Sequence, residues 1–404
     1  MNKNIKLAVA GAVLALSASA NAGIIIPAGE WTMDINGNVN AFANVTKGKG
    51  ATTNTAAIGG LATASQTHED QAQGINTGLL PSWLGFTGTT RQNDTDVSFT
   101  ISMQPNVSGN DAAGDSGTPL NRQAFVTFGD KSWGSVKLGK DIGIFASDAI
   151  LNDMTLLGVG AGAATSGAAT TLGGIGTGYI YAAWKGQIAY TTPNFNGFQA
   201  TVGITNPNQG VGSTTAYTTA TLTTTTTNLY QDRFGLEAKA SYAFSGDVAS
   251  GKIWVSGASY DVTYAASGAS YTASVMDIGA NVNAGNLGLT GYYYSGEGVG
   301  TTTMGNLAHS SGAKRDSDGG YIQATYVLPT KTKLGLAYGT SNLDRANTAD
   351  TAVINKNERI TLGLYHPLTK HLNLVAEYND IESRVHDGTK GESSTGSLGA
   401  ILFF

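Results

Sequence analysis

Apolar and polar residues alternate along most of the chain with a period of two. At the start of the pattern, Trp31, Met33 and Ile35 are apolar, whereas the positions between them are Thr and Asp. Successive side chains of a β-strand point to opposite faces, so this pattern predicts strands with one apolar and one polar face. About sixteen such strands are expected. They lie near residues 31–45, 79–90, 96–104, 121–129, 133–140, 185–192, 198–206, 230–244, 252–264, 272–282, 287–295, 320–328, 333–341, 357–366, 371–380 and 395–404.

The connections between these strands are alternately short and long. The short ones are 91–95, 129–132, 193–197, 245–251, 283–286, 329–332 and 367–370. The long ones are 46–78, 105–120, 141–184, 207–229, 296–319, 342–356 and 381–394, with 265–271 as a shorter member. Short turns at one rim and long loops at the other are typical of transmembrane barrels.

The polar faces of the predicted strands carry Asn, Asp, Arg, Glu and Lys, which suit water better than a packed core. A barrel of about sixteen strands is too wide for side chains to fill, so its inner face is wet. The predicted fold class is therefore all-β, a transmembrane antiparallel β-barrel of about sixteen strands. A secreted β-sandwich, which also hides one face of each strand, stays open as the alternative.

The composition excludes several other classes of protein. Only 13% of the 404 residues are charged, against about 25% in a typical soluble domain. The formal net charge is −5, which argues against a nucleic-acid-binding protein. The absence of cysteine excludes disulfide scaffolds and thiolate metal sites.

Residues 1–22 have the pattern of a secretory signal peptide. Lys3 and Lys6 precede an apolar stretch at 7–16, and the sequence ANA at 20–22 matches a cleavage site. We therefore expect a signal peptide at 1–22 and a mature barrel at 23–404. Loss of the two lysines changes the formal net charge from −5 to −7.

Several hairpins resemble those of the Gram-negative general diffusion porins. The segments 121–126 (NRQAFV) and 134–140 (GSVKLGK), 187–198 (QIAYTTPNFNGF), and 365–378 around YHPLTKHL and AEY carry this resemblance, and the chain ends on Phe404. The resemblance implies a sixteen-stranded homotrimeric barrel in the outer membrane of a Gram-negative bacterium, in contact with lipid and lipopolysaccharide. It also implies that the third long loop folds into the pore, and that loop 105–120 latches onto a neighbouring subunit.

The third long loop corresponds to residues 141–184, and its first part is expected to form a short helical turn. The resemblance implies that Asp148 and Asp153 face basic residues on the barrel wall, and that Lys140 stands where the family usually has an arginine. This sequence departs from the family pattern because residues 154–184 include no charged residue. Lys140 also shares its strand parity with the apolar Val136, so a bulge or the end of the strand must re-aim it if it lines the pore. A lysine at the rim of the barrel is the alternative.

Charged residues on the polar strand faces are the candidates for the barrel wall. A charge that faces lipid at mid-membrane costs about 2–4 kcal/mol, which favours an inward position. These candidates are Asp34, Arg233, Glu237, Lys239, Arg359 and Glu377. The resemblance further implies that the barrel-assembly machinery reads the C-terminal residues, with Leu402 and Phe404 as the signal.

The sequence shows no pattern that indicates catalysis or a cofactor. The five histidines lack paired metal spacing, and the segment 309–311 (HSS) has no hydrolase signature around it. The segment 316–319 (DSDG) begins like a calcium loop, but Val327 stands where the bidentate acid is needed. We therefore predict no enzyme, metal or cofactor, and no nucleic-acid partner.

The predicted function is a water-filled channel through which ions and small hydrophilic solutes diffuse, with a weak preference for cations. The basis for the cation preference is the net charge of −7 alone. A substrate-specific channel and a structural or adhesive barrel without transport remain the alternatives.

Overall fold

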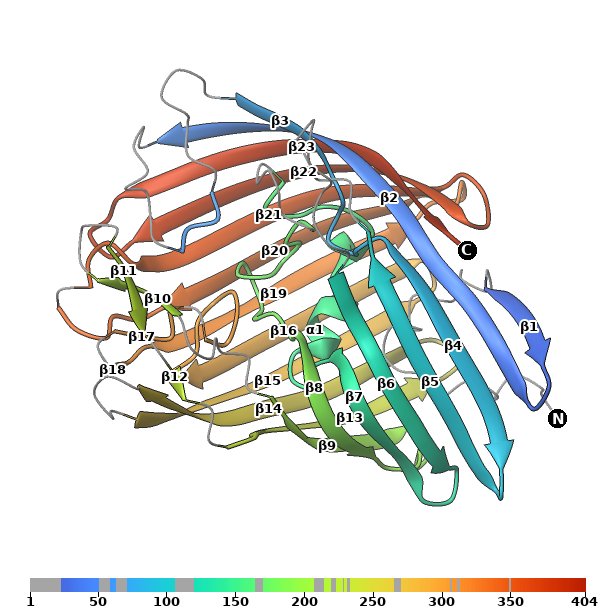
Figure 1. Cartoon of the computed structure of the whole chain (residues 1–404). Coiled ribbons are helices and arrows are strands. Elements are labelled where there is room, and N and C mark those ends of the chain that lie inside the picture. The colour runs from blue at the N-terminus through green and yellow to red at the C-terminus, as the bar shows by residue number, and fades with distance from the viewer. Residues whose placement is uncertain are drawn as a thin grey trace, which may run out of the picture.

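The wall of the molecule is a closed sheet of antiparallel strands that forms a barrel (Figure 1). The computed structural model describes residues 23–50, 59–62, 71–105, 120–163, 170–206, 214–218, 223–227, 229–230, 233–264, 270–305, 307–310, 313–348 and 350–404. The predicted signal peptide and most of the predicted latch loop therefore lie outside the described residues.

The described residues form a wall of sixteen strands, which confirms the predicted fold class. One wall position is shared by two segments, β3 (Gln71–Asn76) and β4 (Trp83–Gln92). The other positions are β2 (Trp31–Gly50), β5 (Thr95–Gln104), β6 (Leu120–Asp130), β7 (Gly134–Ile142), β8 (Trp184–Thr191), β9 (Phe198–Thr205), β13 (Gly235–Ser245), β14 (Ser250–Tyr264), β15 (Ser270–Ala284), β16 (Leu287–Glu297), β19 (Asp316–Val327), β20 (Lys333–Leu343), β21 (Ile354–Pro367), β22 (Leu372–Val385) and β23 (Lys390–Phe403). Each strand pairs with its neighbour in the chain, and β2 pairs with β23 to close the barrel.

The alternating sequence pattern becomes the two faces of this wall. Large apolar side chains such as Leu398 and Ile322 are 67% and 64% exposed on the outer face. Their neighbours in the strands, such as Ser397 and Tyr321, are buried on the inner face. Closure of the barrel pairs the backbone N–H and C=O groups along the wall. A strand can cross the hydrocarbon of a membrane only when these groups are paired.

The second wall strand is interrupted at residues 77–82, where the sequence pattern predicts a continuous strand from 79 to 90. Side chains of β2 replace the missing backbone partners. Asn38 donates to Pro81 O at 2.8 Å, and Asn40 donates to Leu80 O at 3.0 Å and accepts from Gly78 N at 2.8 Å. The asparagines thereby let residues 77–82 leave the ladder and turn their side chains toward the interior.

Tight turns connect the strands at one rim. The hairpin between β4 and β5 turns at Asn93 and Asp94, with φ of 48° and 59°. Positive φ at both central residues gives a turn whose twist matches that of the flanking strands, and Asn and Asp tolerate it. The predicted short connection at 91–95 is therefore present.

Smaller elements accompany the wall. These are β1 (Ile24–Ala28), β10 (Thr214–Thr218), β11 (Thr223–Thr227), β12 (Leu229–Tyr230), β17 (His309–Ser310), β18 (Ala313–Lys314), the helix α1 (Ser147–Leu151) and the 3₁₀ helix η2 (Met154–Leu157). β1 pairs antiparallel with the first residues of β2. Neither helix of the described residues is both long and apolar enough to cross a membrane.

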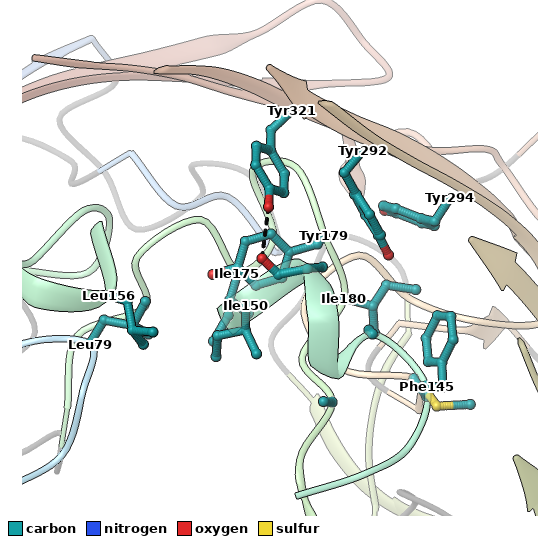
Figure 2. Packing of buried hydrophobic residues seen from close by; sticks show 14 of the residues in the cluster. Leu79, Phe145, Ile150, Leu156, Ile175, Tyr179, Ile180, Tyr292, Tyr294 and Tyr321 are labelled. Carbon is teal, nitrogen blue, oxygen red and sulfur yellow. Dashed lines mark hydrogen bonds between the residues drawn. The ribbon is translucent and has the colours of Figure 1, made fainter. Parts of the chain in front are cut away.

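A hydrophobic core lies inside the barrel, between the loop after β7 and the wall strands β16 and β19. The loop contributes Phe145, Tyr179 and Ile180, each fully buried, and the wall contributes Tyr292 and Tyr321 (Figure 2). The ring centroids of Tyr179 and Tyr321 are 5.8 Å apart in an edge-on arrangement. The resemblance-based prediction that the third long loop enters the barrel agrees with this packing.

Candidate functional site

The loop at residues 143–183 forms the inner part of the candidate site. The chain enters α1 through Ala146, whose left-handed φ of 59° turns it away from β7. η2 begins after Asp153, whose Oδ1 accepts a hydrogen bond from the Thr155 N–H at 2.9 Å. The short helical turn predicted for the start of the loop is therefore confirmed.

Asp148 in α1 lies between two lysines of adjacent wall strands. Lys239 Nζ of β13 lies 2.9 Å from Asp148 Oδ2, and Lys252 Nζ of β14 contacts Oδ1. Lys239 also donates to Ser147 Oγ at 2.9 Å. Burial opposes ionisation of Asp148, but the two ammonium groups outweigh it and hold the pKa of the carboxyl below its ordinary value.

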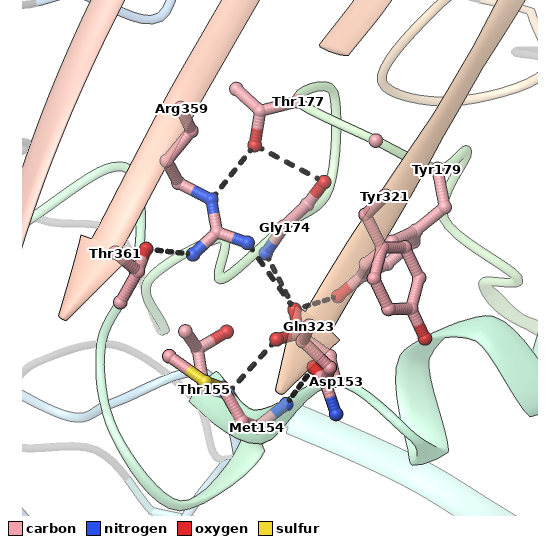
Figure 3. A network of polar contacts seen from close by, with 12 residues as sticks. Asp153, Met154, Thr155, Gly174, Thr177, Tyr179, Tyr321, Gln323, Arg359 and Thr361 are labelled. Atoms are coloured by element: carbon pink, nitrogen blue, oxygen red, sulfur yellow. Dashed lines mark hydrogen bonds and ion pairs between the residues drawn. The ribbon is translucent and has the colours of Figure 1, made fainter. Parts of the chain in front are cut away.

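Asp153 is the centre of a second polar group (Figure 3). Its Oδ2 accepts hydrogen bonds from Gly174 N at 2.9 Å and from the Tyr179 hydroxyl at 2.8 Å. Arg359 of β21 lies 3.8 Å from the same oxygen and donates through Nε to Thr177 Oγ1 at 3.1 Å. Burial and the nearby Asp153 raise the pKa of Tyr179 well above its usual value, so its hydroxyl stays a neutral donor. Asp153 and Arg359 thus join distant parts of the loop to the wall.

Glu237 of β13 accepts hydrogen bonds from the backbone of the loop entrance. Its Oε2 accepts from Ile144 N at 2.7 Å and from Phe145 N at 2.9 Å, while Oε1 lies 2.6 Å from Lys185 Nζ. The side chains of Glu237 and Lys185 are only 3% and 4% exposed. A wall carboxylate therefore takes up two backbone donors that the turn before α1 leaves without partners.

Glu377 of β22 does the same for the chain that follows η2. Its Oε2 accepts from Val159 N at 3.0 Å and from Gly160 N at 2.9 Å. Its Oε1 accepts from the Tyr365 hydroxyl at 2.8 Å. A Cβ on Gly158 would lie 1.9 Å from Glu377 Oε1, so the loop can approach this carboxylate closely because the residue is glycine.

The wall charges therefore hold the loop in one position across the interior of the barrel. They come from β13, β14, β21 and β22, and they contact the loop at residues 144, 148, 153 and 159. Removing one partner from a buried charged pair costs about 3–5 kcal/mol, because the other charge remains buried without it. By fixing the position of the loop, these contacts set the width of the passage between the loop and the wall.

This arrangement, a closed barrel with a charged loop held inside it, can be compared with known proteins. The family model described as Gram-negative porin matches residues 7–386. The chain belongs to the Gram-negative porin family. This porin is accordingly an outer-membrane channel for diffusion, and its sixteen strands cross the membrane. None of the curated proteins matches the chain.

Solved structures share the fold of this porin at low sequence identity. The outer membrane channel DcaP of Acinetobacter baumannii is 15% identical with a TM-score of 0.68, over 94% of this chain and 99% of that one. The anion-selective porin of Comamonas acidovorans is 17% identical with a TM-score of 0.62, over 93% and 100%. OmpT of Vibrio cholerae in its trimer form is 13% identical with a TM-score of 0.55, over 93% and 99%.

The structure brings most of the sequence-predicted charges together around the loop. Asp148 meets Lys239, Asp153 meets Arg359, and the carboxylates of Glu237 and Glu377 meet the loop backbone, as described above. The acids of the loop thus face basic residues of the wall.

Three other predicted residues lie apart from this group. Lys140 is exposed on the face that carries Val136 and Leu138, and it donates to Asn121 O at 2.9 Å. Its place agrees with its strand parity, because no bulge turns it inward. Arg233 precedes β13, and its side chain is 70% exposed, with Nη1 2.7 Å from Asp261 Oδ2. Asp34 lies near the start of β2, opposite residue 25 of β1.

Three further residues that hold the loop were not predicted from the sequence. These are Lys185, Lys252 and Gln323 of the wall. Gln323 accepts from Met154 N at 2.9 Å and donates to Asn152 O at 2.7 Å. Strand parity could have identified them, because all three alternate with apolar residues of the outer face, such as Ile253 beside Lys252.

The last residues of the porin lie at the seam where β23 meets β2. Leu402 pairs with Val39 and is 39% exposed on the outer face. Phe404 exchanges two backbone hydrogen bonds with Gly37, of 2.8 and 3.0 Å. A Cβ at Gly37 would meet Trp83 O at 2.2 Å, so the close contact at the seam requires glycine there.

No metal centre is formed in the part of the chain that the structure describes. There, no group of three or more His, Asp or Glu side chains is placed to hold a metal ion.

Proposed function

We propose that this porin is a passive, water-filled channel for ions and small hydrophilic solutes, and not an enzyme. The observation that carries the proposal is the loop at 143–183, which wall charges hold inside a closed barrel. Such a loop filters solutes by size and charge and requires no energy source, no cofactor and no catalytic residue.

Liposome swelling tests this proposal. Purified porin is reconstituted into liposomes, which are then diluted into iso-osmotic solutions of neutral sugars of increasing size. We expect swelling whose rate falls steeply as the sugar grows, because the loop narrows the passage. Swelling no faster than that of protein-free liposomes would support a structural or adhesive barrel instead.

We further propose a weak preference for cations. The formal net charge of −7 expected after loss of residues 1–22 supports it. The pairing of loop acids with wall bases keeps the preference weak, because paired charges nearly cancel at a distance. The reversal potential across a planar bilayer in a KCl gradient measures the preference, and a clear anion selectivity would contradict it.

The assembly of the porin is a further part of the proposal. We propose that residues 1–22 are a cleaved signal peptide, that the barrel forms a homotrimer, and that it contacts lipopolysaccharide. The trimer form of one structural neighbour and the apolar outer face support this. We also propose that Leu402 and Phe404 are read by the barrel-assembly machinery. Deletion of Phe404 is expected to reduce heat-modifiable trimer in outer-membrane fractions, and a normal amount would contradict this role.

A substrate-specific channel is the second candidate function. An apolar pocket between the loop and the wall favours it, because a purely hydrophilic passage has no use for such a surface.

A further inference from the structure

An apolar pocket lies inside the barrel between the loop and the wall strands. The wall side includes Leu79 and Trp83, and the loop side includes Ile150, Leu156 and Leu172. The cavity between them has a volume of about 150 Å³. An apolar cavity of about this volume holds a body of the size of benzene. Figure 2 shows Leu79 and Leu156 together, apart from the tyrosines of the hydrophobic core to which they belong.

The interruption of the second wall strand creates the wall side of this pocket. Leu79 leaves the ladder of the sheet and donates its N–H to Gly158 O of the loop at 2.9 Å. A regular strand would send every second side chain at 77–82 to the outer face. The break therefore places apolar side chains inside a barrel whose inner face is otherwise largely polar.

Arg122 of β6 supplies a positive charge at the pocket. The pairing of β6 with β5 skips it, since Gln123 pairs with Ser102 and Asn121 pairs with Met103. Arg122 is thus the extra residue of a β-bulge, a device that re-aims a side chain. Its backbone N–H donates to Gln104 Oε1 at 3.0 Å, which fixes the bulge.

The guanidinium of Arg122 is available to a ligand. It lies 6.0 Å from the ring centroid of Trp184 and forms no ion pair with any acid in the described part of the chain. Asp141, which shares a hydrogen bond with Gln123, is already paired with Lys137. The basic residues that hold the loop, Lys185, Lys239, Lys252 and Arg359, each lie beside an acid, so Arg122 differs from them.

Tyr181 adds a hydroxyl donor to the pocket lining. Burial raises the pKa of this hydroxyl although the positive Arg122 acts in the opposite direction, so the group stays protonated. A planar guanidinium binds a carboxylate through two parallel hydrogen bonds, and a neutral hydroxyl can add a third. The surrounding aliphatic and aromatic side chains favour an apolar body on the same solute, at about 25 cal/mol per Å² of apolar surface removed from water.

We propose that this pocket binds a carboxylate with a compact apolar body, of the class of benzoate, with Arg122 as the residue that recognises the carboxylate. The inference rests on the proposed channel function and gives it a class of preferred solute. Recognition combines two groups, so neither the charge alone nor the apolar body alone is sufficient.

Equilibrium dialysis of labelled benzoate against purified porin in detergent tests the pocket without relying on conduction. We expect saturable binding that unlabelled benzoate displaces at least tenfold better than acetate or benzyl alcohol. Arg122→Gln is expected to weaken binding at least tenfold, and Arg122→Lys to weaken it less, because lysine keeps the charge but not the planar fork. Arg384→Gln is the matched control, since Arg384 is exposed and pairs with Glu382.

Heat-modifiable mobility establishes that each variant has folded. Equal displacement by benzoate and acetate would overturn the role of the apolar wall, and unchanged binding by folded Arg122→Gln would overturn the role of Arg122. In planar bilayers, benzoate is then expected to reduce the ion current of the parent porin and less so that of Arg122→Gln. Binding without any ion current would refute the channel function but not the pocket, so the two failures are distinguishable.

Discussion

The anchoring of the loop by wall charges is tested most sharply at Glu237. The substitution Glu237→Gln keeps the shape of the side chain and removes its charge. The carboxylate accepts from Ile144 N, Phe145 N and Lys185 Nζ, at 2.7, 2.9 and 2.6 Å. In glutamine an NH₂ group replaces one of the two carboxylate oxygens, so only one oxygen can still accept a hydrogen bond. The NH₂ group is itself a donor and would face the donors that the lost oxygen had bound. Either the loop N–H groups or the lysine therefore lose their partner in a buried site.

The expected loss of loop docking is about 3–5 kcal/mol, the cost of breaking a buried charged pair. Since about 1.4 kcal/mol is a factor of ten, the open population of the loop rises by a hundredfold or more. Chymotrypsin cleavage after Phe145 or Tyr179 measures this population, because proteolysis follows the equilibrium amount of the open form when opening is fast. The wall strands are unchanged, so heat-modifiable mobility is expected to persist.

Two further variants make the result decisive. The control variant Glu382→Gln removes an equal charge from an exposed cluster with Arg384 and Lys390. An ion pair at such an exposed position contributes about 0–1 kcal/mol, so this variant is expected to leave the rate of cleavage unchanged. Lys185→Met combined with Glu237→Gln removes both buried charges and is expected to restore part of the protection. Equal cleavage of the parent and Glu237→Gln would refute the anchoring argument.

Three other predictions concern the charges and the seam. Arg359→Gln leaves the negative charge of Asp153 without its basic neighbour, so the K⁺ over Cl⁻ permeability ratio in a KCl gradient is expected to rise; an unchanged ratio would mean that this pair does not act on permeating ions. Because the folded pKa of Asp148 is lowered, its contribution to loop docking is present above the ordinary value of 3.8 and is lost only as the pH falls below it. Titration of this group is therefore expected to leave single-channel conductance unchanged between pH 7 and pH 5. Gly37→Val places side-chain atoms against Trp83 O and the ring of Phe404, so less heat-modifiable protein is expected on gels; parent-like amounts would show that the seam tolerates a side chain.

Strand parity made the wall predictable from the sequence. Glu237, Lys239, Arg359 and Glu377 alternate with apolar neighbours, and the structure places all four on the inner face in contact with the loop. Lys140 shows the same rule from the other side, because its parity is outward and the structure leaves it there. The alternation of apolar and polar residues shows on which face of the strand a side chain lies, because the face depends on local backbone geometry alone.

The height of a residue in the barrel and the path of the loop are set by contacts between distant segments. The entry of loop 143–183 into the barrel was predicted only through family resemblance, since its apolar composition suits several environments. The break at 77–82 depends on Asn38 and Asn40 of another strand, and the alternation of 79–90 conceals it. The bulge at Arg122 likewise depends on how β6 pairs with β5, and the sequence of one strand alone does not predict this pairing.

Single-channel recording on purified, heat-modifiable porin in planar bilayers tests whether the barrel is a passive aqueous channel. We expect stepwise insertions with a linear current–voltage relation at low voltage. We also expect a conductance that rises in proportion to KCl concentration, because the passage is aqueous and passive. Folded barrels that insert into the bilayer and carry no ion current would contradict it.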